Sequence, residues 1–216
     1  MNTAFPRSGL YAITDSVLWP GSRLLNAVAQ AIEGGARVIQ YREKHRKPDI
    51  GLVRDLLDLC QMHRLPLIIN DDLDLAVQIG ADGVHLGRHD RSLGEARRTI
   101  GDQAIVGISC YASIEMAARA EQDGADYVAF GCFFPSRTKP DAKPADIGVL
   151  THRAVKIPVI AIGGITPDNG RELLDSGADL LAVISGIFGD PNPARAAARY
   201  VRLFEMRPVQ ANRAVQ

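Results

Sequence analysis

The sequence predicts an α/β protein, a single-domain (β/α)8 TIM barrel, on three observations. Eight short apolar runs are spread along the 216 residues of the chain. Helix-like stretches separate these runs, and a Gly-Ala pair precedes every second one. Eight strands that alternate with helices within about 200 residues fit a small barrel of this type. The alternative is an open, doubly wound parallel sheet.

The eight apolar runs have the composition of buried parallel strands. Their continuous apolar character is typical of a sheet that is covered on both faces. The expected strands are residues 10–13, 38–41, 66–69, 83–86, 104–108, 127–130, 158–162 and 180–184. Helix-like segments such as residues 52–60 and 114–120 lie between them. We therefore expect helices to enclose a barrel of strands.

The Gly-Ala pairs mark the ends of four expected helices. Glycine is the usual residue after a helix because it readily adopts the left-handed conformation that ends one. The glycines of the pairs are Gly35, Gly80, Gly124 and Gly177, at intervals of 45, 44 and 53 residues. Each interval has the length of two β-α units, which favours the barrel.

The composition indicates one globular domain without a strong overall charge. Hydrophobic residues make up 46% of the chain and charged residues 23%, which are ordinary values for a globular enzyme. Lys and Arg number 25, as do Asp and Glu, so no global field favours nucleic acid or an anionic membrane. We expect the barrel to span residues 1–206 and residues 207–216, which include Pro208, to form a disordered tail.

The N-terminus and the cysteines indicate a cytoplasmic protein. Residues 1–9 contain no apolar core of signal-peptide length, and no apolar run approaches a membrane span. Cys60, Cys110 and Cys132 are far apart, odd in number and without zinc or redox spacing. We therefore expect reduced thiols.

Polar residues follow nearly every apolar run. In a (β/α)8 barrel the carboxyl ends of the strands carry the active site, so these residues are expected at one rim. They include Thr14, Asp15, Gln40, Arg42, Lys44, Asn70, Asp71, His85, Asp90, Ser109, Gly163, Gly164, Ser185 and Gly186. The regular placement of small, hydroxylic and charged groups predicts a functional rim.

One part of this rim is predicted to bind phosphate. Gly163 and Gly164 lead into Thr166 and Pro167, which look like an N-cap and the first turn of a helix. Ser185 and Gly186 follow the next strand, and barrels build phosphate pockets after their last two strands. The alternative is that the glycines serve only the geometry of a tight turn.

A second part of the rim carries two aspartates, Asp71 and Asp90, on loops of adjacent strands. Mg²⁺ binds one or two carboxylates together with waters and substrate phosphate oxygens, so a magnesium site is one interpretation. The other interpretation is that Asp71 caps the helix that follows it. Zinc is disfavoured because His85 and His89 lack a third ligand nearby.

A third part supplies positive charge from Arg42, Lys44 and Lys139. Arg presents a flat fork to phosphate oxygens and Lys a mobile point charge. Glu43 lies between Arg42 and Lys44, so the alternation of side chains along a strand is expected to point it toward the helices. The alternative for this segment is a solvated, ion-paired run. Lys139 lies in a proline-rich loop, residues 130–144, that also carries hydroxyl groups.

Over residues 10–205 the sequence resembles the thiamine phosphate synthase family. The matching segments are LYAITD (10–15), QYREK (40–44), IND (69–71), GADGVHLG (80–87), GIS (107–109), FPSRTKP (134–140), AIGGI (161–165) and VIS (183–185). QYREK together with IND and P-S-x-T-K is the specific part of this pattern, whereas AIGGI is common in phosphate-binding barrels.

The resemblance implies a transferase that joins a pyrimidine diphosphate to a thiazole phosphate, with release of diphosphate. The implied pyrimidine diphosphate ligands are Gln40, Tyr41, Arg42, Glu43, Lys44, Asn70, Ser109 and Lys139. The implied thiazole phosphate ligands are Ser136, Arg137, Thr138, Gly163, Gly164, Ile184 and Ser185. Asp71 and Asp90 would hold Mg²⁺, and Lys139, Arg42, Lys44 and Ser109 would be catalytic. The expected partners are these two small molecules, and the sequence leaves open whether the chain forms a homo-oligomer.

The sequence departs from the family pattern at three positions and leaves two other functions open. Arg88 stands where many members have Gln, Ser136 where Thr is usual, and Cys132 where Pro is frequent. A thiazole tautomerase of the same superfamily is one alternative, but Tyr111 stands where a tautomerase is expected to have His. A non-catalytic barrel that binds a phosphate ligand is the other, but it would be expected to have lost a metal-site aspartate.

Overall fold

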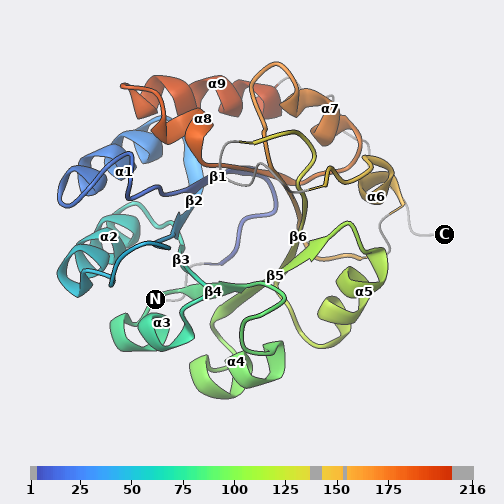
Figure 1. Ribbon diagram of the computed structural model, residues 1–216, viewed down its shortest axis with the longest axis horizontal. Coiled ribbons are helices and arrows are strands. Elements are labelled where there is room, and N and C mark those ends of the chain that lie inside the picture. The colour runs from blue at the N-terminus through green and yellow to red at the C-terminus, as the bar shows by residue number, and fades with distance from the viewer. Residues whose placement is uncertain (1–3, 137–142, 153–154, 206–216) are drawn as a thin grey trace.

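The computed structural model describes residues 4–136, 143–152 and 155–205, and it shows a closed barrel of eight parallel strands (Figure 1). Each strand pairs with the next along the chain, and β8 pairs with β1. The strands are β1 Gly9–Ile13, β2 Ala36–Tyr41, β3 Leu67–Asn70, β4 Gly83–Leu86, β5 Ile105–Tyr111, β6 Tyr127–Gly131, β7 Val159–Ile162 and β8 Leu180–Val183. All eight predicted strands and the (β/α)8 barrel are confirmed, and the doubly wound alternative is wrong.

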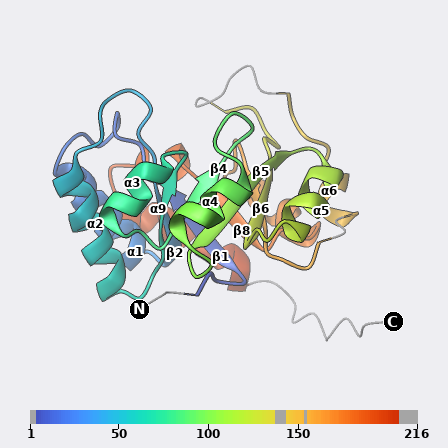
Figure 2. The same cartoon turned by 90° about the horizontal axis from the view of Figure 1, so that it is seen from below.

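Helices surround the barrel in chain order, as α2, α3 and α4 show along one flank in Figure 2. They are α1 Arg23–Glu33, α2 Ile50–Met62, α3 Leu73–Ile79, α4 Leu93–Ile100, α5 Ile114–Gln122, α6 Gly148–Thr151, α7 Gly170–Asp175, α8 Ser185–Phe188 and α9 Pro193–Glu205. The last helix packs against α1 and completes the ring. Among the described residues, no helix has the length and apolar character that crossing a membrane requires.

The apolar side chains form two layers because successive residues of a strand point to opposite faces. In β1, Tyr11 and Ile13 face the barrel interior, while Leu10 and Ala12 pack under the helices. Phe5 stacks on an interior tyrosine at the amino end of the barrel. Burial on both faces explains why the strands are continuously apolar.

The Gly-Ala pairs end helices as predicted. The glycines Gly35, Gly80, Gly124 and Gly177 have φ of +97°, +71°, +93° and +116°. At the end of α3, Gly80 is left-handed and its N–H donates to the helix carbonyls of Ala76 and Val77. These turns lie at the amino ends of the strands, so the loops at the carboxyl ends are left to build the site.

Candidate active site

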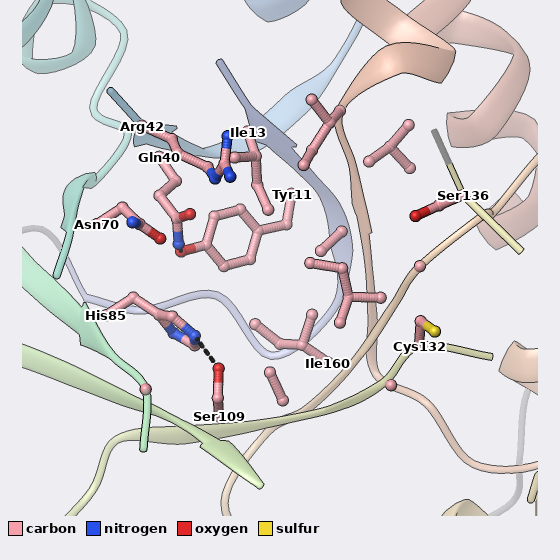
Figure 3. Close-up of a pocket in the computed structure, with 18 of the residues that line it drawn as sticks. Tyr11, Ile13, Gln40, Arg42, Asn70, His85, Ser109, Cys132, Ser136 and Ile160 are labelled. Carbon is pink, nitrogen blue, oxygen red and sulfur yellow. Dashed lines mark hydrogen bonds between the residues drawn. The ribbon is translucent and has the colours of Figure 1, made fainter. Parts of the chain in front are cut away.

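A cavity of about 390 Å³ lies at the carboxyl ends of the strands (Figure 3), where barrels hold their ligands. Twelve residues of the predicted site line it: Gln40, Arg42, Lys44, Asn70, Asp71, Asp90, Ser109, Ser136, Gly163, Gly164, Ile184 and Ser185. All eight strands and the segments that follow six of them contribute to the lining. The structure thus brings these residues together, while their individual roles stay predictions.

Polar side chains from β2 to β5 line one side of the cavity. Gln40, Asn70, His85 and Ser109 follow one another around this side in Figure 3, and Asn70 pairs with His85 on the adjacent strand. Gln40 Nε2 donates a hydrogen bond of 2.8 Å to Tyr11 Oη, and His85 Nε2 lies 2.8 Å from Ser109 Oγ. Polar groups held in fixed positions within an apolar pocket are suited to orienting a small polar ring.

Two cationic residues reach the cavity from the segment after β2. The backbone N–H of Arg42 donates to Thr14 Oγ1 at 2.9 Å, and the fully buried Thr14 thereby ties this segment to β1. The ammonium of Lys44 forms an ion pair with the carboxylate of Asp71. The ion-paired alternative is thus partly correct, but the partner of Lys44 is a cavity carboxylate. Both cations are placed to meet an anionic ligand.

Asp71 and its neighbour Asp72 have different functions. Asp72 is the N-cap of α3, because its Oδ1 accepts a hydrogen bond of 2.9 Å from the N–H of Leu75. The interpretation of Asp71 as the helix cap is therefore wrong. Asp71 instead has φ of +62°, a conformation uncommon outside glycine, and its carboxylate faces the cavity. This backbone geometry turns one aspartate to the helix and the other to the site.

Asp90 completes a pair of carboxylates with Asp71. Its Oδ2 accepts a hydrogen bond of 2.6 Å from the N–H of Gly87, which fixes the loop after β4. Burial raises the pKa of Asp90, and the Asp71 carboxylate within hydrogen-bonding reach raises it further, although the Gly87 N–H acts in the opposite direction. Two adjacent carboxylates of this kind fit Mg²⁺, which would take its other ligands from water and phosphate oxygens. Within the described ranges, no group of three or more His, Cys, Asp or Glu side chains forms a metal cluster.

The opposite side of the cavity is built from glycine backbone and hydroxyl groups. Gly163 and Gly164 have φ of +102° and +62°, and a Cβ at Gly164 would lie 2.4 Å from the carbonyl oxygen of Pro135. Close packing against the loop after β6 therefore requires glycine, as the tight-turn interpretation proposed. Ser136 and Ser185 lie at the same side, so the surface remains suited to an anion even though the glycines have a packing role.

The turn that leads into α7 is capped by Thr166. The regular helix is assigned from Gly170, but the N–H of Gly170 already donates to the Thr166 carbonyl at 2.9 Å. The N–H of Thr166 donates to Asn169 Oδ1 at 2.8 Å, and Thr166 Oγ1 accepts from the N–H of Asn169 at 3.3 Å. These reciprocal bonds are those of a capping box, so Thr166 has the capping role that was predicted, although α7 itself begins later.

Some residues of the predicted site are placed away from the cavity or are not described. Tyr41 is buried among the helix-facing side chains, and burial raises the pKa of its hydroxyl to about 12. Glu43 Oε1 accepts hydrogen bonds from the N–H groups of His45 and Arg46 at 2.7 and 3.1 Å, which orders the loop. Neither residue lines the cavity. Arg137, Thr138 and Lys139 lie outside the described residues.

The sequence analysis missed polar groups of the cavity wall and floor. Tyr11 and Tyr127 were assigned to apolar strands, yet their hydroxyls pair at 2.9 Å inside the barrel. Alternation along β1 places Tyr11 on the same face as Ile13 and could have revealed its inward direction. At the mouth, the guanidinium of Arg88 lies 4.6 Å from the centre of the Tyr111 ring, so Arg88 stacks on an aromatic ring.

A closed (β/α)8 barrel whose carboxyl rim gathers carboxylates, cations and a glycine-rich surface is typical of enzymes that bind phosphate ligands. The chain belongs to the thiamine monophosphate synthase family, whose family model matches residues 10–187. Members of this family are transferases. This chain is 50% identical over 197 residues to the thiamine-phosphate synthase of Marinobacter nauticus, and the match covers 89% of each chain. It is 49% identical to that of Methylococcus capsulatus, covering 94% of this chain and 92% of the relative.

Solved structures show the same relationship. The thiamine phosphate pyrophosphorylase of Pyrococcus furiosus superposes with a TM-score of 0.83 at 36% identity. The superposition covers 92% of this chain and 96% of the other. The resemblance in sequence, the barrel and membership of a transferase family are therefore confirmed.

Proposed function

We propose that this chain is a thiamine phosphate synthase that joins 4-amino-2-methyl-5-(diphosphooxymethyl)pyrimidine to a thiazole phosphate. The observation that carries the proposal is the two-sided cavity. Asp71, Asp90 and Lys44 gather on one side, and Ser136 and Ser185 lie on the other. Two anionic substrates can therefore bind with their reactive ends facing each other. The similarity of the chain to thiamine-phosphate synthases supports the same activity.

The carboxylate side is assigned to the pyrimidine diphosphate. Arg42 and Lys44 would bind the diphosphate oxygens, and Gln40, Asn70 and Ser109 would orient the pyrimidine ring. Asp71 and Asp90 would hold Mg²⁺, which would neutralise the charge that builds up on the leaving diphosphate. Lys139 is predicted from sequence to assist the same anion. The glycine and hydroxyl side is assigned to the thiazole phosphate, with Arg137 and Thr138 as further predicted ligands.

The reaction proposed for this geometry is a dissociative substitution. The C–O bond between the pyrimidine methylene and the diphosphate breaks first, and the diphosphate leaves with the electron pair. The electron-rich aminopyrimidine carries the cation until the lone pair of the thiazole nitrogen forms the new C–N bond. No proton has to be removed, so the protein contributes positioning and charge stabilisation rather than a general base. The cations at the cavity edge suit this requirement.

The proposal is tested by incubating the purified chain with both substrates and Mg²⁺ and measuring thiamine phosphate. We expect product with both substrates, none when either is omitted, and loss of turnover in EDTA that Mg²⁺ restores. A tautomerase would consume a thiazole substrate alone, and a non-catalytic barrel would bind ligand in calorimetry without forming product. Full turnover in EDTA would contradict the metal assignment.

Whether the C–O bond breaks before the C–N bond forms can be tested separately. An electron-withdrawing substituent on the pyrimidine should slow the reaction steeply because it destabilises the cation. If the same substituent speeds turnover, attack precedes departure and the dissociative mechanism is wrong.

A further inference from the structure

A continuous chain of hydrogen bonds crosses the interior of the barrel beneath the cavity. Gln40 Nε2 donates to Tyr11 Oη at 2.8 Å, and Tyr11 Oη lies 2.9 Å from Tyr127 Oη. Tyr127 Oη lies 3.0 Å from His85 Nδ1, and His85 Nε2 lies 2.8 Å from Ser109 Oγ. We call these five residues the polar chain. Its two ends, Gln40 and Ser109, both line the cavity (Figure 3).

The middle of the polar chain lies in an apolar environment. Tyr11 and Tyr127 are 1% and 0% exposed, and interior side chains of the barrel surround them. Phe5 stacks on the Tyr127 ring with centroids 4.3 Å apart. A buried hydroxyl without a partner costs about 1–3 kcal/mol, so the hydrogens of both tyrosines need acceptors within the chain. Burial also raises the pKa of both hydroxyls, so each keeps its proton.

This requirement gives the polar chain a direction. Because Gln40 donates to Tyr11 Oη, the Tyr11 hydrogen must go to another atom, and the acceptor in reach is Tyr127 Oη. The Tyr127 hydrogen then goes to His85 Nδ1, which must be unprotonated to accept it. His85 consequently carries its proton on Nε2, which donates to Ser109 Oγ.

The reverse direction leaves a group without a partner. If Tyr127 donated to Tyr11, the Tyr11 oxygen would accept two bonds and its own hydrogen would have no acceptor among the described residues. Tyr11 is only 1% exposed at the floor of the cavity, so a water that served its hydrogen would have to be held in place there. The forward direction satisfies every hydrogen of the two tyrosines.

We propose that Tyr127, which accepts from Tyr11, is a positioning residue that holds His85 in the Nε2–H tautomer. The Ser109 hydroxyl, which accepts from His85, is thereby left to donate its hydrogen into the cavity, and the amide oxygen of Gln40 is left to accept. An aminopyrimidine offers the complement, a ring nitrogen that accepts and an amino group that donates. The substrate part of this inference rests on the proposed function, whereas the tautomer does not.

The tautomer is tested without substrate, by NMR of the full chain labelled in its imidazole nitrogens. The spectra are recorded at one pH above the usual histidine pKa of about 6.5, with His85→Gln used to assign the signals. We expect His85 to be protonated on Nε2 alone in the wild-type chain and to exchange between tautomers in Tyr127→Phe. A wild-type proton on Nδ1, or a tautomer that is unchanged in Tyr127→Phe, overturns the proposal.

Tyr11→Phe provides an independent variant that does not touch His85. Removing the Tyr11 hydroxyl leaves His85 Nδ1 as the acceptor in reach of the buried Tyr127 hydrogen, so His85 should stay protonated on Nε2. This variant carries the test if Tyr127→Phe does not fold, because a His85 tautomer that becomes mixed in a folded Tyr11→Phe chain contradicts the requirement that the Tyr127 hydrogen goes to His85. Tyr200→Phe is the control: it removes a buried hydroxyl that donates to the Ile165 carbonyl at 3.1 Å and should leave the His85 signals in place.

The positioning role has a kinetic signature. In Tyr127→Phe we expect kcat/KM for the pyrimidine diphosphate to fall about tenfold, which is the effect of one misplaced hydrogen bond. The KM for the thiazole phosphate should not change, because its predicted ligands lie on the other side of the cavity. Equal changes for both substrates would indicate a general loss of structure and contradict positioning. Failure of the proposed function would instead abolish the assay and leave the NMR result intact.

Discussion

The two ends of the barrel use the same side chain, aspartate, for opposite purposes. At the amino end, aspartates follow three of the Gly-Ala pairs and accept hydrogen bonds from the first residues of neighbouring strands. Asp82 accepts from the N–H of Leu67 at 3.0 Å, Asp126 from Val106 at 2.7 Å and Asp179 from Val159 at 2.9 Å. At the carboxyl end, Asp71 and Asp90 lie beside each other on one side of the cavity, and Asp71 forms an ion pair with Lys44.

The difference teaches how to separate structural from functional carboxylates. An aspartate whose oxygen accepts from backbone N–H groups of another strand stabilises the fold. Asp71 and Asp90 instead lie where their charges repel, a cost that a bound cation would relieve. Strained backbone also occurs at the cavity. Two of the described non-glycine residues with positive φ, Asp71 and Tyr111, line it.

The largest effect is expected at the carboxylate pair. Asp71→Asn and Asp90→Asn should each lower kcat on the order of a hundredfold, because losing one electrostatic contact to a leaving group costs roughly 3 kcal/mol. Their stability should change little, since each substitution removes repulsion between like charges, which offsets the loss of the Lys44–Asp71 ion pair in Asp71→Asn. Initial rates at saturating substrates and urea unfolding measure the two quantities.

Asp72→Asn is the matched control for Asp71→Asn. Asp72 lies next to Asp71 in the chain but caps α3, and asparagine caps a helix about as well as aspartate, so this substitution should leave stability and kcat nearly unchanged. If Asp71→Asn unfolded the chain as readily as it lowered activity, the functional assignment of Asp71 would lose its basis.

The next effect concerns the opposite side of the cavity. Ser185→Asp should raise the KM for the thiazole phosphate at least tenfold by charge repulsion, an effect of about 1.4 kcal/mol. The KM for the pyrimidine diphosphate should change little. Steady-state kinetics with each substrate varied in turn measures both values, and equal increases would show that the two sub-sites are wrongly assigned. Gly164→Val is a poorer probe, since its Cβ would clash with the loop carbonyls of Phe134 and Pro135.

The barrel could be predicted because its signals are local. Apolar runs and the glycines that end helices are visible in short windows of sequence, and they place the polar residues that follow the strands at one rim. That is why Asp71, Asp90 and Ser109, which lie far apart in the sequence, were expected together. Alternation along β2 would also have turned Tyr41 away from the cavity, because Gln40 points into it.

The remaining features depend on geometry that a sequence does not display. Which of Asp71 and Asp72 caps α3 depends on a positive φ at Asp71. The hydroxyls of Tyr11 and Tyr127 meet across 116 positions of the chain, and only closure of the barrel brings them together. Polar contacts inside a closed barrel are therefore the features that require a structure.

The smallest effect is expected at the amino end, where stability rather than activity should respond. Asp126 accepts from Val106 N–H and forms an ion pair with Arg97, whose guanidinium also donates to the carbonyls of Gly124 and Ala104. Asp126→Ala leaves these donors without their carboxylate and should lower the free energy of unfolding by about 1–2 kcal/mol. The Asp126 side chain is 39% exposed, so the loss of unfolding free energy should be smaller than for a fully buried ion pair.

Asp123→Ala supplies the control from the same turn. Its ion pair with Arg119 spans 3.5 Å between side chains that are 84% and 56% exposed, and such surface pairs contribute about 0–1 kcal/mol. Urea unfolding should therefore separate the two variants, while kcat stays at the wild-type value in both, because neither aspartate lines the cavity. If Asp126→Ala were as stable as Asp123→Ala, or lost activity while folded, the assignment of the amino-end aspartates to stability and of the carboxyl-end aspartates to activity would be wrong.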